Sequence, residues 1–266
     1  MIKLIATDID GTILIPEGQF RQSVKDFIAK LVKSGIKVVL VTGRMNAAAC
    51  MIAKDLNLDT PVISYQGGLV NENGKILYER CLTENQAERV VQWAKKEKIH
   101  LNLYNNDILY SETQSPEVIR YCNNLHTEYT FKPFSEVKKD RINKLLAIDY
   151  DNPERVSRYE KELQELFPDL NIVKSTPYFL EFSNPEASKY CAVKFLQDYW
   201  NIKETETLAI GDQNNDIPLL QSGGIKVAMG NATPELKACA DYITDTVQND
   251  GFIKAVEKFC PEVCKL

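Results

Sequence analysis

Short apolar runs alternate with amphipathic helical patterns over the first 64 residues of the chain. Apolar side chains at positions 24, 27, 28, 31 and 32 recur with the spacing of one helix face, and Gly35 ends this pattern. Residues 36–41 are β-branched and almost continuously apolar, as in a strand of a parallel sheet that is buried on both faces. A second helix over residues 46–56 and a strand over residues 61–64 follow. This alternation predicts βαβ units and therefore a parallel sheet.

The pattern changes between residues 82 and 184. Helical patterns there are separated by strands in which polar and apolar residues alternate, at residues 101–104, 108–110, 143–150, 171–174 and 178–182. Such alternation is typical of an antiparallel sheet with helices on one face and solvent on the other. Buried-type strands return after residue 206. We therefore expect an α/β protein with a core of residues 1–81 and 185–266 and an inserted second domain of residues 82–184.

The bulk properties of the chain narrow the classes of function and partner. It has 266 residues, 44% of them hydrophobic, and a formal net charge of −5. This length allows two domains with cores of their own, and the negative charge argues against nucleic acid and anionic membranes as partners. Seven cysteines are scattered without a CxxC pair, which is typical of a reduced, cytoplasmic setting. No apolar run reaches membrane-spanning length.

Two carboxylates lie where the first predicted strand ends. Asp8 and Asp10 are separated by one residue, so in extended backbone their side chains point to the same side. A carboxylate beside another resists ionising, so one can stay charged and attack phosphorus while the other holds a proton for the leaving oxygen. Mg²⁺ prefers oxygen ligands and would offset the charge of such a pair. The alternative is an ordinary turn, because Asp-Gly is a common turn signal.

Polar clusters follow three of the apolar strands, at residues 8–12, 42–44 and 211–216. In an open α/β sheet, ligands bind outside the carboxyl ends of the strands, so we expect these clusters to meet in one site. Thr42 and the Gly43 amide could donate hydrogen bonds to phosphate oxygens. Asp212 could be a further magnesium ligand, and Asn215 could donate without adding charge. Lys189 could offset the phosphate charge. Taken singly, each feature is as readily an ordinary turn or a solvated lysine.

Four motifs make the chain resemble a known family. They are DIDGT at residues 8–12, VTGR at 41–44, SK at 188–189 and GDQNND at 211–216. Together they are similar to the motifs of the haloacid dehalogenase-like (HAD) hydrolases, and the chain resembles the Cof-type, or class IIB, phosphatases over nearly its whole length. The resemblance implies a Rossmann-like core with a parallel sheet. Because the long insertion lies between the second and third motifs, it also implies an α/β cap of type C2B with an antiparallel sheet.

The resemblance assigns roles to individual residues. It implies that Asp8 is the nucleophile and that Asp10 is the general acid and base. Mg²⁺ would be held by the Asp8 carboxylate, the Asp10 backbone carbonyl and Asp212. The substrate would be bound by the Ile9 amide, Thr42, Gly43, Arg44, Lys189 and Asn215, and Asp216 would orient Lys189 or a metal-bound water.

Two positions depart from the family pattern. Tyr190 follows the lysine of the third motif, where the family usually has glycine, and we expect it to alter the start of the helix and to crowd the site. Gln66-Gly67 stands where Asn-Gly is usual, and we expect changed contacts near the hinge of the inserted domain. Neither departure removes a catalytic group.

These observations lead to one expected function and two alternatives. We expect a Mg²⁺-dependent phosphatase that hydrolyses a small phosphorylated metabolite, a sugar phosphate or a phosphorylated cofactor, through an aspartyl-phosphate on Asp8. It would act as a cytoplasmic monomer. A phosphotransferase or phosphomutase would share every core residue, and a non-catalytic metabolite-binding protein on the same fold is the third hypothesis. Candidates for substrate selection in the inserted domain are Tyr104, Asn105, Asn106, Tyr178 and Glu181.

Overall fold

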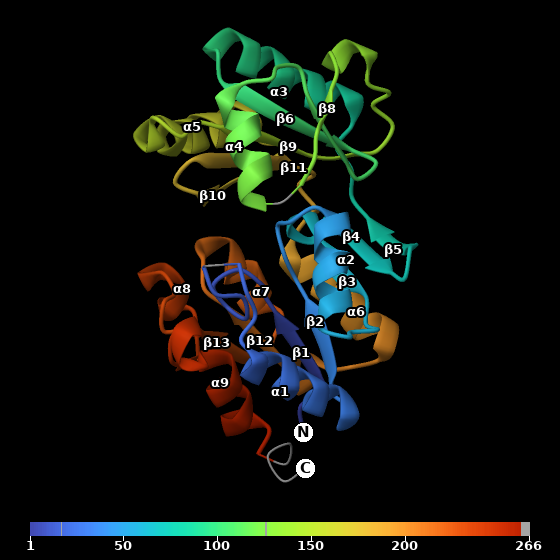
Figure 1. Cartoon of the computed structure of the whole chain (residues 1–266), viewed down its shortest axis with the longest axis vertical. Coiled ribbons are helices and arrows are strands. Elements are labelled where there is room, and N and C mark those ends of the chain that lie inside the picture. Colours follow the sequence, from blue (N-terminus) through green and yellow to red (C-terminus); the bar gives the residue numbers. More distant parts are fainter. Residues whose placement is uncertain (17, 126, 262–266) are drawn as a thin grey trace. The chain divides into compact units, whose positions relative to one another are not determined.

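The structure is a computed structural model that describes residues 1–16, 18–125 and 127–261. The chain divides into two compact units (Figure 1). The first combines Met1–Tyr78 with Ser188–Leu266, and the second is the continuous segment Glu79–Ala187. In the ranges described, no helix is both long enough and apolar enough to cross a membrane.

A parallel five-stranded sheet forms the centre of the first unit, in the order β14-β13-β12-β1-β2. Its strands are β1 (Leu4–Thr7), β2 (Lys37–Leu40), β12 (Thr207–Gly211), β13 (Ile225–Ala228) and β14 (Tyr242–Ile243). β1 pairs with β12 on one side and with β2 on the other, so that Leu4 lies opposite both Thr207 and Lys37. The carboxyl ends of these three strands therefore lie side by side. The predicted parallel sheet is confirmed.

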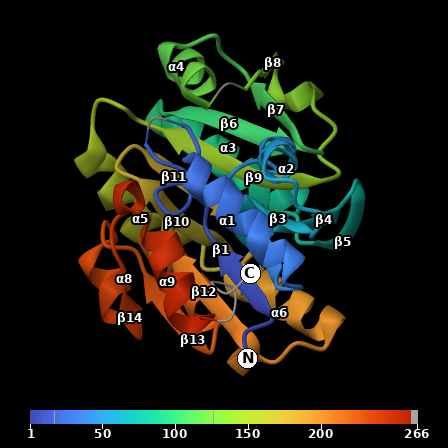
Figure 2. The same ribbon diagram turned by 60° about the horizontal axis from the view of Figure 1, so that its bottom comes forward.

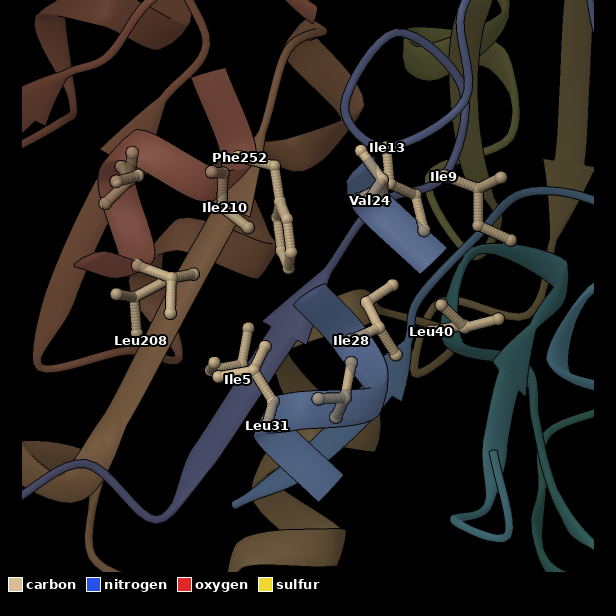
Figure 3. Packing of buried hydrophobic residues seen from close by; sticks show 14 of the residues in the cluster. Ile5, Ile9, Ile13, Val24, Ile28, Leu31, Leu40, Leu208, Ile210 and Phe252 are labelled. Atoms are coloured by element: carbon tan, nitrogen blue, oxygen red, sulfur yellow. The ribbon is translucent and has the colours of Figure 1, made fainter. Parts of the chain in front are cut away.

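Helices cover both faces of this sheet. They are α1 (Gln22–Lys33), α2 (Asn46–Asp55), α6 (Lys189–Trp200), α7 (Ile217–Gln221), α8 (Pro234–Ala238) and α9 (Gly251–Phe259). α1 and α9 cross one face (Figure 2), where the rings of Phe27 and Phe252 meet edge to face with centroids 6.4 Å apart. Ile5 of β1 packs into this cluster (Figure 3), whereas its neighbour Leu4 packs with Leu196 of α6 on the opposite face. β1 is thus buried on both sides, as its apolar run predicts.

A small three-stranded sheet, in which β3 and β4 are antiparallel, begins beside β2. Its strands are β3 (Val62–Ser64), β4 (Leu69–Glu72) and β5 (Lys75–Glu79). Val41, just after β2, forms a parallel bridge to Ile63 in β3. The end of β3 therefore lies next to the end of β2. A short 3-10 turn, Tyr65–Gly67, follows β3 at this edge.

The second unit is built on a six-stranded sheet in the order β10-β11-β9-β6-β7-β8. Its strands are β6 (His100–Asn105), β7 (Ile108–Ser111), β8 (Thr130–Phe131), β9 (Ile142–Ile148), β10 (Asn171–Thr176) and β11 (Phe179–Ser183). Every pair is antiparallel except β7 with β8. Its helices are α3 (Glu84–Glu97), α4 (Pro116–Leu125) and α5 (Pro153–Leu166). The α/β fold with one parallel and one antiparallel sheet is confirmed.

The two faces of the second sheet are covered differently. α3 and α5 pack on one face in a large apolar cluster. The other face is less exposed than the sequence predicts, because Tyr121 of α4 contacts Phe179 edge to face and accepts a hydrogen bond from the Tyr104 hydroxyl at 2.6 Å. Lys144 and Glu181 are both buried and pair at 2.9 Å. Polar residues of these strands therefore form hydrogen bonds and ion pairs within the protein instead of facing solvent. The alternation of polar and apolar residues in the sequence could not reveal this.

Candidate active site

Asp8 follows the last residue of β1. Its amide donates to the carbonyl of Ile210 at 3.0 Å, which extends the pairing of β1 with β12 by one residue. The next residue, Ile9, anchors this end of the strand because its side chain is buried in the core (Figure 3). Lys189, the first residue of α6, places Nζ 2.6 Å from Asp8 Oδ1. The fold thus joins two motifs that are 181 residues apart in the chain.

Lys189 is held between two carboxylates. Its Nζ also lies 2.5 Å from Oδ1 of Asp216, and its side chain is only 1% exposed. Burial alone would lower the pKa of Lys189, but Asp216 and then Asp8 raise it above its usual value, so the ammonium stays charged. The Ser188 hydroxyl caps α6 by accepting the Tyr190 amide at 3.2 Å. Tyr190 therefore leaves the start of this helix capped, and its side chain is exposed.

Asp212 follows β12 and reaches the loop after β1. Its Oδ1 accepts from the Thr12 hydroxyl at 3.0 Å, and its Oδ2 accepts from Gln213 Nε2 at 2.9 Å. Gly11 has φ of 80°, and a Cβ there would lie 2.4 Å from Asp212 Oδ2, so this approach requires glycine. Burial, followed by the charge of Asp216, raises the pKa of Asp212 to about 6.

Three buried carboxylates meet around the one ammonium of Lys189. Asp8, Asp212 and Asp216 each place an oxygen within 4.8 Å of the others. Burial raises the pKa of Asp8 well above its usual value, Asp216 adds to this rise, and Lys189 opposes it. The cluster therefore has a deficit of positive charge. Its hard oxygen donors fit Mg²⁺ better than a softer metal.

Asp216 is the least available of the three as a metal ligand. Its Oδ1 is bound by Lys189, and its Oδ2 accepts the backbone amides of Asp212 at 3.0 Å and Gln213 at 3.1 Å. The partners of the Asp212 carboxylate, by contrast, are neutral side chains that can yield to a cation. The side chains of Asp8 and Asp212 are therefore the better ligand candidates.

Asp10 is more exposed than this cluster, and Arg44 holds it. The Asp10 side chain is 53% exposed, and Arg44 binds both of its oxygens, with Nε at 2.8 Å and Nη2 at 2.6 Å. After burial, Asp216 and Asp212, the charge of Asp10 also contributes to the raised pKa of Asp8. The spacing of the two acids predicted that they would be close. It did not indicate that Arg44 would bind the second one.

Gln66 lies between the end of β2 and the loop after β12 and contacts both. The Thr42 side chain is buried, and its Oγ1 accepts the Arg44 amide at 3.1 Å. The side-chain amide of Asn215 donates to Gln66 Oε1 at 3.2 Å. A Cβ at Gly43 would lie 2.4 Å from Gln66 Nε2. The predicted residues of the second and fourth motifs are thus connected through a residue that was not predicted to belong to the site.

Gln66 and Asn231 are neighbours of the site that the sequence analysis did not assign to it. Asn231 donates from Nδ2 to the carbonyl of Gly11 at 2.9 Å and lies 3.5 Å from Asp212 Oδ2. It follows β13, and Gln66 follows β3. Because both come after the carboxyl ends of strands, the rule that singled out the other clusters could have found them.

Comparisons with known proteins identify the family of the chain. Residues 5–256 match the family model of haloacid dehalogenase-like hydrolases. Phosphatase YwpJ of Bacillus subtilis is 28% identical over 276 residues, which cover 94% of this chain and 97% of the relative. The 5-amino-6-(5-phospho-D-ribitylamino)uracil phosphatase YwtE of the same organism is 25% identical over 276 residues, with 94% and 95% covered. The structure of BT1666 from Bacteroides thetaiotaomicron, described among phosphatases of the HAD superfamily, has a TM-score of 0.84 and 28% identity, with 97% of each chain covered.

The family match spans nearly the whole chain, and both of these Bacillus subtilis relatives, which match it nearly end to end, carry the name phosphatase. The family that the four motifs predict is therefore confirmed. The chain belongs to the haloacid dehalogenase-like hydrolases and is a phosphatase of the Cof-type group.

Proposed function

We propose that the protein is a Mg²⁺-dependent phosphomonoesterase that acts on a small phosphorylated metabolite through an aspartyl-phosphate on Asp8. One observation carries most of this proposal. The buried Lys189 ammonium lies 2.6 Å from the Asp8 carboxylate. A carboxylate attacks only when it is deprotonated, and this ammonium favours the deprotonated form in a buried site that otherwise opposes it.

In the first step, an oxygen of Asp8 attacks phosphorus and the ester P–O bond breaks. The leaving oxygen takes the electron pair of that bond and a proton from Asp10, so the product departs as an alcohol. The phosphoryl oxygens are bound by Lys189, Thr42, Asn215 and the amides of Ile9 and Gly43.

In the second step, water attacks phosphorus and the bond to Asp8 breaks. Asp10, now a carboxylate, takes a proton from the attacking water. Inorganic phosphate leaves and both acids return to their starting state. Because Arg44 binds both oxygens of Asp10, we assign it to positioning this acid, in addition to the predicted contact with substrate.

The metal fits the acidic cluster. Mg²⁺ would be held by the carboxylates of Asp8 and Asp212 and by the backbone carbonyl of Asp10. When bound, it supplies positive charge that lets an anionic phosphoryl group approach these acids. Asp216 keeps Lys189 in place, because it binds the ammonium through one oxygen and the backbone of the loop through the other.

We assign residues 82–184 as a cap that selects the substrate and residues 1–81 with 185–266 as the catalytic core. The relative YwtE is named as a phosphatase of a compound with a phosphorylated ribityl group. This supports a sugar phosphate or a phosphorylated cofactor as the substrate class. The net charge of −5 supports a small-molecule substrate over nucleic acid. We infer a cytoplasmic monomer.

The test is phosphate release from a panel of sugar phosphates, nucleotides, flavin mononucleotide and pyridoxal phosphate. We expect release from at least one substrate with Mg²⁺ and none with chelator. A second sugar added to the assay distinguishes hydrolysis, which yields free phosphate, from transfer, which yields a new sugar phosphate. If nothing is released while members of the panel raise the melting temperature, the protein binds metabolites without turning them over and the proposal is wrong.

A further inference from the structure

The turn that follows β3 has an unusual backbone conformation. Tyr65 and Gln66 have φ of 52° and 57°, and Gly67 has φ of 94°. Residues other than Gly, Asn and Asp rarely adopt this left-handed region, so two such residues in succession must be held there by their surroundings. Asn or Gly would fit position 66 with less strain. Backbone geometry alone therefore does not explain a glutamine at this position.

Contacts with two motifs fix the turn in place. Its first two amides donate to the carbonyls of Arg44 and Thr42, each at 3.0 Å. Its third residue, Gly67, lies so close to the third motif that a Cβ there would be 2.2 Å from the carbonyl carbon of Ser188. The turn is thus held against the strand ends where the candidate catalytic residues meet.

Gln66 is a buried residue, 6% exposed, and its side-chain amide has a defined orientation. Oε1 accepts the hydrogen bond from Asn215 Nδ2, which directs Nε2 away from Asn215. Nε2 occupies the space that the missing Cβ of Gly43 leaves open. Within residues 1–16, 18–125 and 127–261, no group accepts a hydrogen bond from this nitrogen.

We propose that Gln66 Nε2 binds the phosphoryl group of the substrate, an inference that rests on the proposed function. Because Nε2 has no acceptor among the described residues, a ligand oxygen at this position would supply one. The groups around it, Thr42, Gly43 and Asn215, are also assigned as donors, so the ligand must present several acceptor oxygens at once. A phosphoryl group does so. Gln66 donates to it without adding charge, and its other amide atom holds Asn215 in position.

Two substitutions separate binding from structure. Gln66→Glu keeps the shape but places an anion where the donor was, and Gln66→Met keeps the length without any donor. We expect both to raise the inhibition constant of inorganic phosphate at least about tenfold, and Gln66→Glu to raise it more, because a hydrogen bond to a charged group is lost and repulsion is added. Gln248→Glu, at an exposed position of the same unit, adds the same charge and should leave the constant unchanged.

A second measurement does not depend on whether the variants fold. In the wild-type protein with Mg²⁺, inorganic phosphate should shift the side-chain amide resonance of Gln66 in a ¹⁵N spectrum and leave that of Gln248 in place. Folded Gln66 variants with the wild-type inhibition constant, or a Gln66 resonance that phosphate does not move, would overturn the inference. A Gln66 response in a protein that releases no phosphate would instead contradict the proposed hydrolysis and leave phosphate binding by Gln66 standing.

Discussion

Each unit of the molecule buries a lysine, and the two lysines differ in their partners. Lys189 in the first unit lies between the carboxylates of Asp8 and Asp216, with a third buried acid in the same cluster. Lys144 in the second unit pairs with Glu181 at 2.9 Å. The first arrangement has more acids than bases, whereas the second pairs one acid with one base.

This difference separates a site from a structural contact. A balanced buried pair can persist without a ligand, because each charge compensates for the desolvation of the other. A surplus of buried carboxylates is unfavourable while all of them are charged, since burial penalises every charge that has no counterpart. Protonation or a cation bound from outside the chain can relieve it, and the three carboxylates are compatible with such a cation. Substitutions in the Lys189 cluster should therefore lower mainly the activity, whereas substitutions in the Lys144–Glu181 pair should lower mainly the stability.

The largest effect is expected at the nucleophile. Asp8→Asn should lower kcat by about 10⁴-fold or more, because an amide oxygen does not attack phosphorus. The melting temperature without metal should stay the same or rise, since one carboxylate leaves a crowded cluster. Phosphate release and thermal unfolding measure the two effects, and Asp59→Asn, at an exposed position, is the control. Residual activity within about tenfold of wild type would exclude Asp8 as the nucleophile.

Matched substitutions of the two lysines test the comparison itself. Lys189→Met should lower kcat/KM by about 10³-fold, because the nucleophile and the phosphoryl group lose their cation. Lys144→Met should instead lower the free energy of unfolding by about 3 to 5 kcal/mol, since Glu181 stays buried without this partner.

The double substitution Lys144→Met with Glu181→Leu should recover most of the stability lost in Lys144→Met alone, because no charge then remains buried at that position. Denaturant unfolding and steady-state kinetics of the same preparations give both quantities. The comparison fails if Lys144→Met loses as much activity as Lys189→Met at unchanged stability.

A smaller effect is expected where Arg44 holds Asp10. Arg44→Gln should lower kcat about tenfold for an alkyl phosphate and less for p-nitrophenyl phosphate, whose good leaving group needs little protonation. In an Asp10→Asn background the same substitution should lower kcat little further, because the effect of Arg44 on kcat acts through Asp10. Arg158→Gln, on an exposed helix face, is the control. Equal losses with both substrates would show that Arg44 acts only in binding.

The smallest effect concerns stability without metal. The pKa of Asp212 is raised by burial and then by Asp216 from 3.8 to about 6. Between these values the folded protein binds more protons than the unfolded chain, so this group lowers the free energy of unfolding as pH rises through that window. With chelator present, the melting temperature of the wild type should therefore fall more than that of Asp212→Asn as the pH is raised from about 4 to about 6. Identical slopes for the two proteins would contradict this pKa.

The centre of the site could be predicted from the sequence because its residues follow strand ends. Asp8 and Asp212 each come after an apolar strand, and the pairing of β1 with β12 brings them together. Lys189 was predicted from the need for a cation and from the resemblance, and the position of α6 delivers it to Asp8. Each of these residues is placed by the regular geometry of a parallel sheet.

The periphery of the site could not be predicted in the same way. The bidentate contact of Arg44 with Asp10 depends on side-chain conformations that no spacing encodes. The strand-end rule could have found Gln66, but its left-handed turn, which its own residue type disfavours, and its contact with Asn215 depend on tertiary contacts. The sequence also did not predict that the second face of the six-stranded sheet is covered, because this depends on where Tyr121 of α4 packs.

The most direct test of the central claim is to trap the intermediate. Under single-turnover conditions with the best substrate and Mg²⁺, the reaction is quenched in acid within milliseconds and the peptides are measured by mass spectrometry. The peptide that contains Asp8 should gain a phosphoryl group and lose it again as phosphate accumulates, and Asp8→Asn should gain none. Phosphate release without any phosphorylated Asp8, or with the phosphoryl group on another residue, would contradict the account.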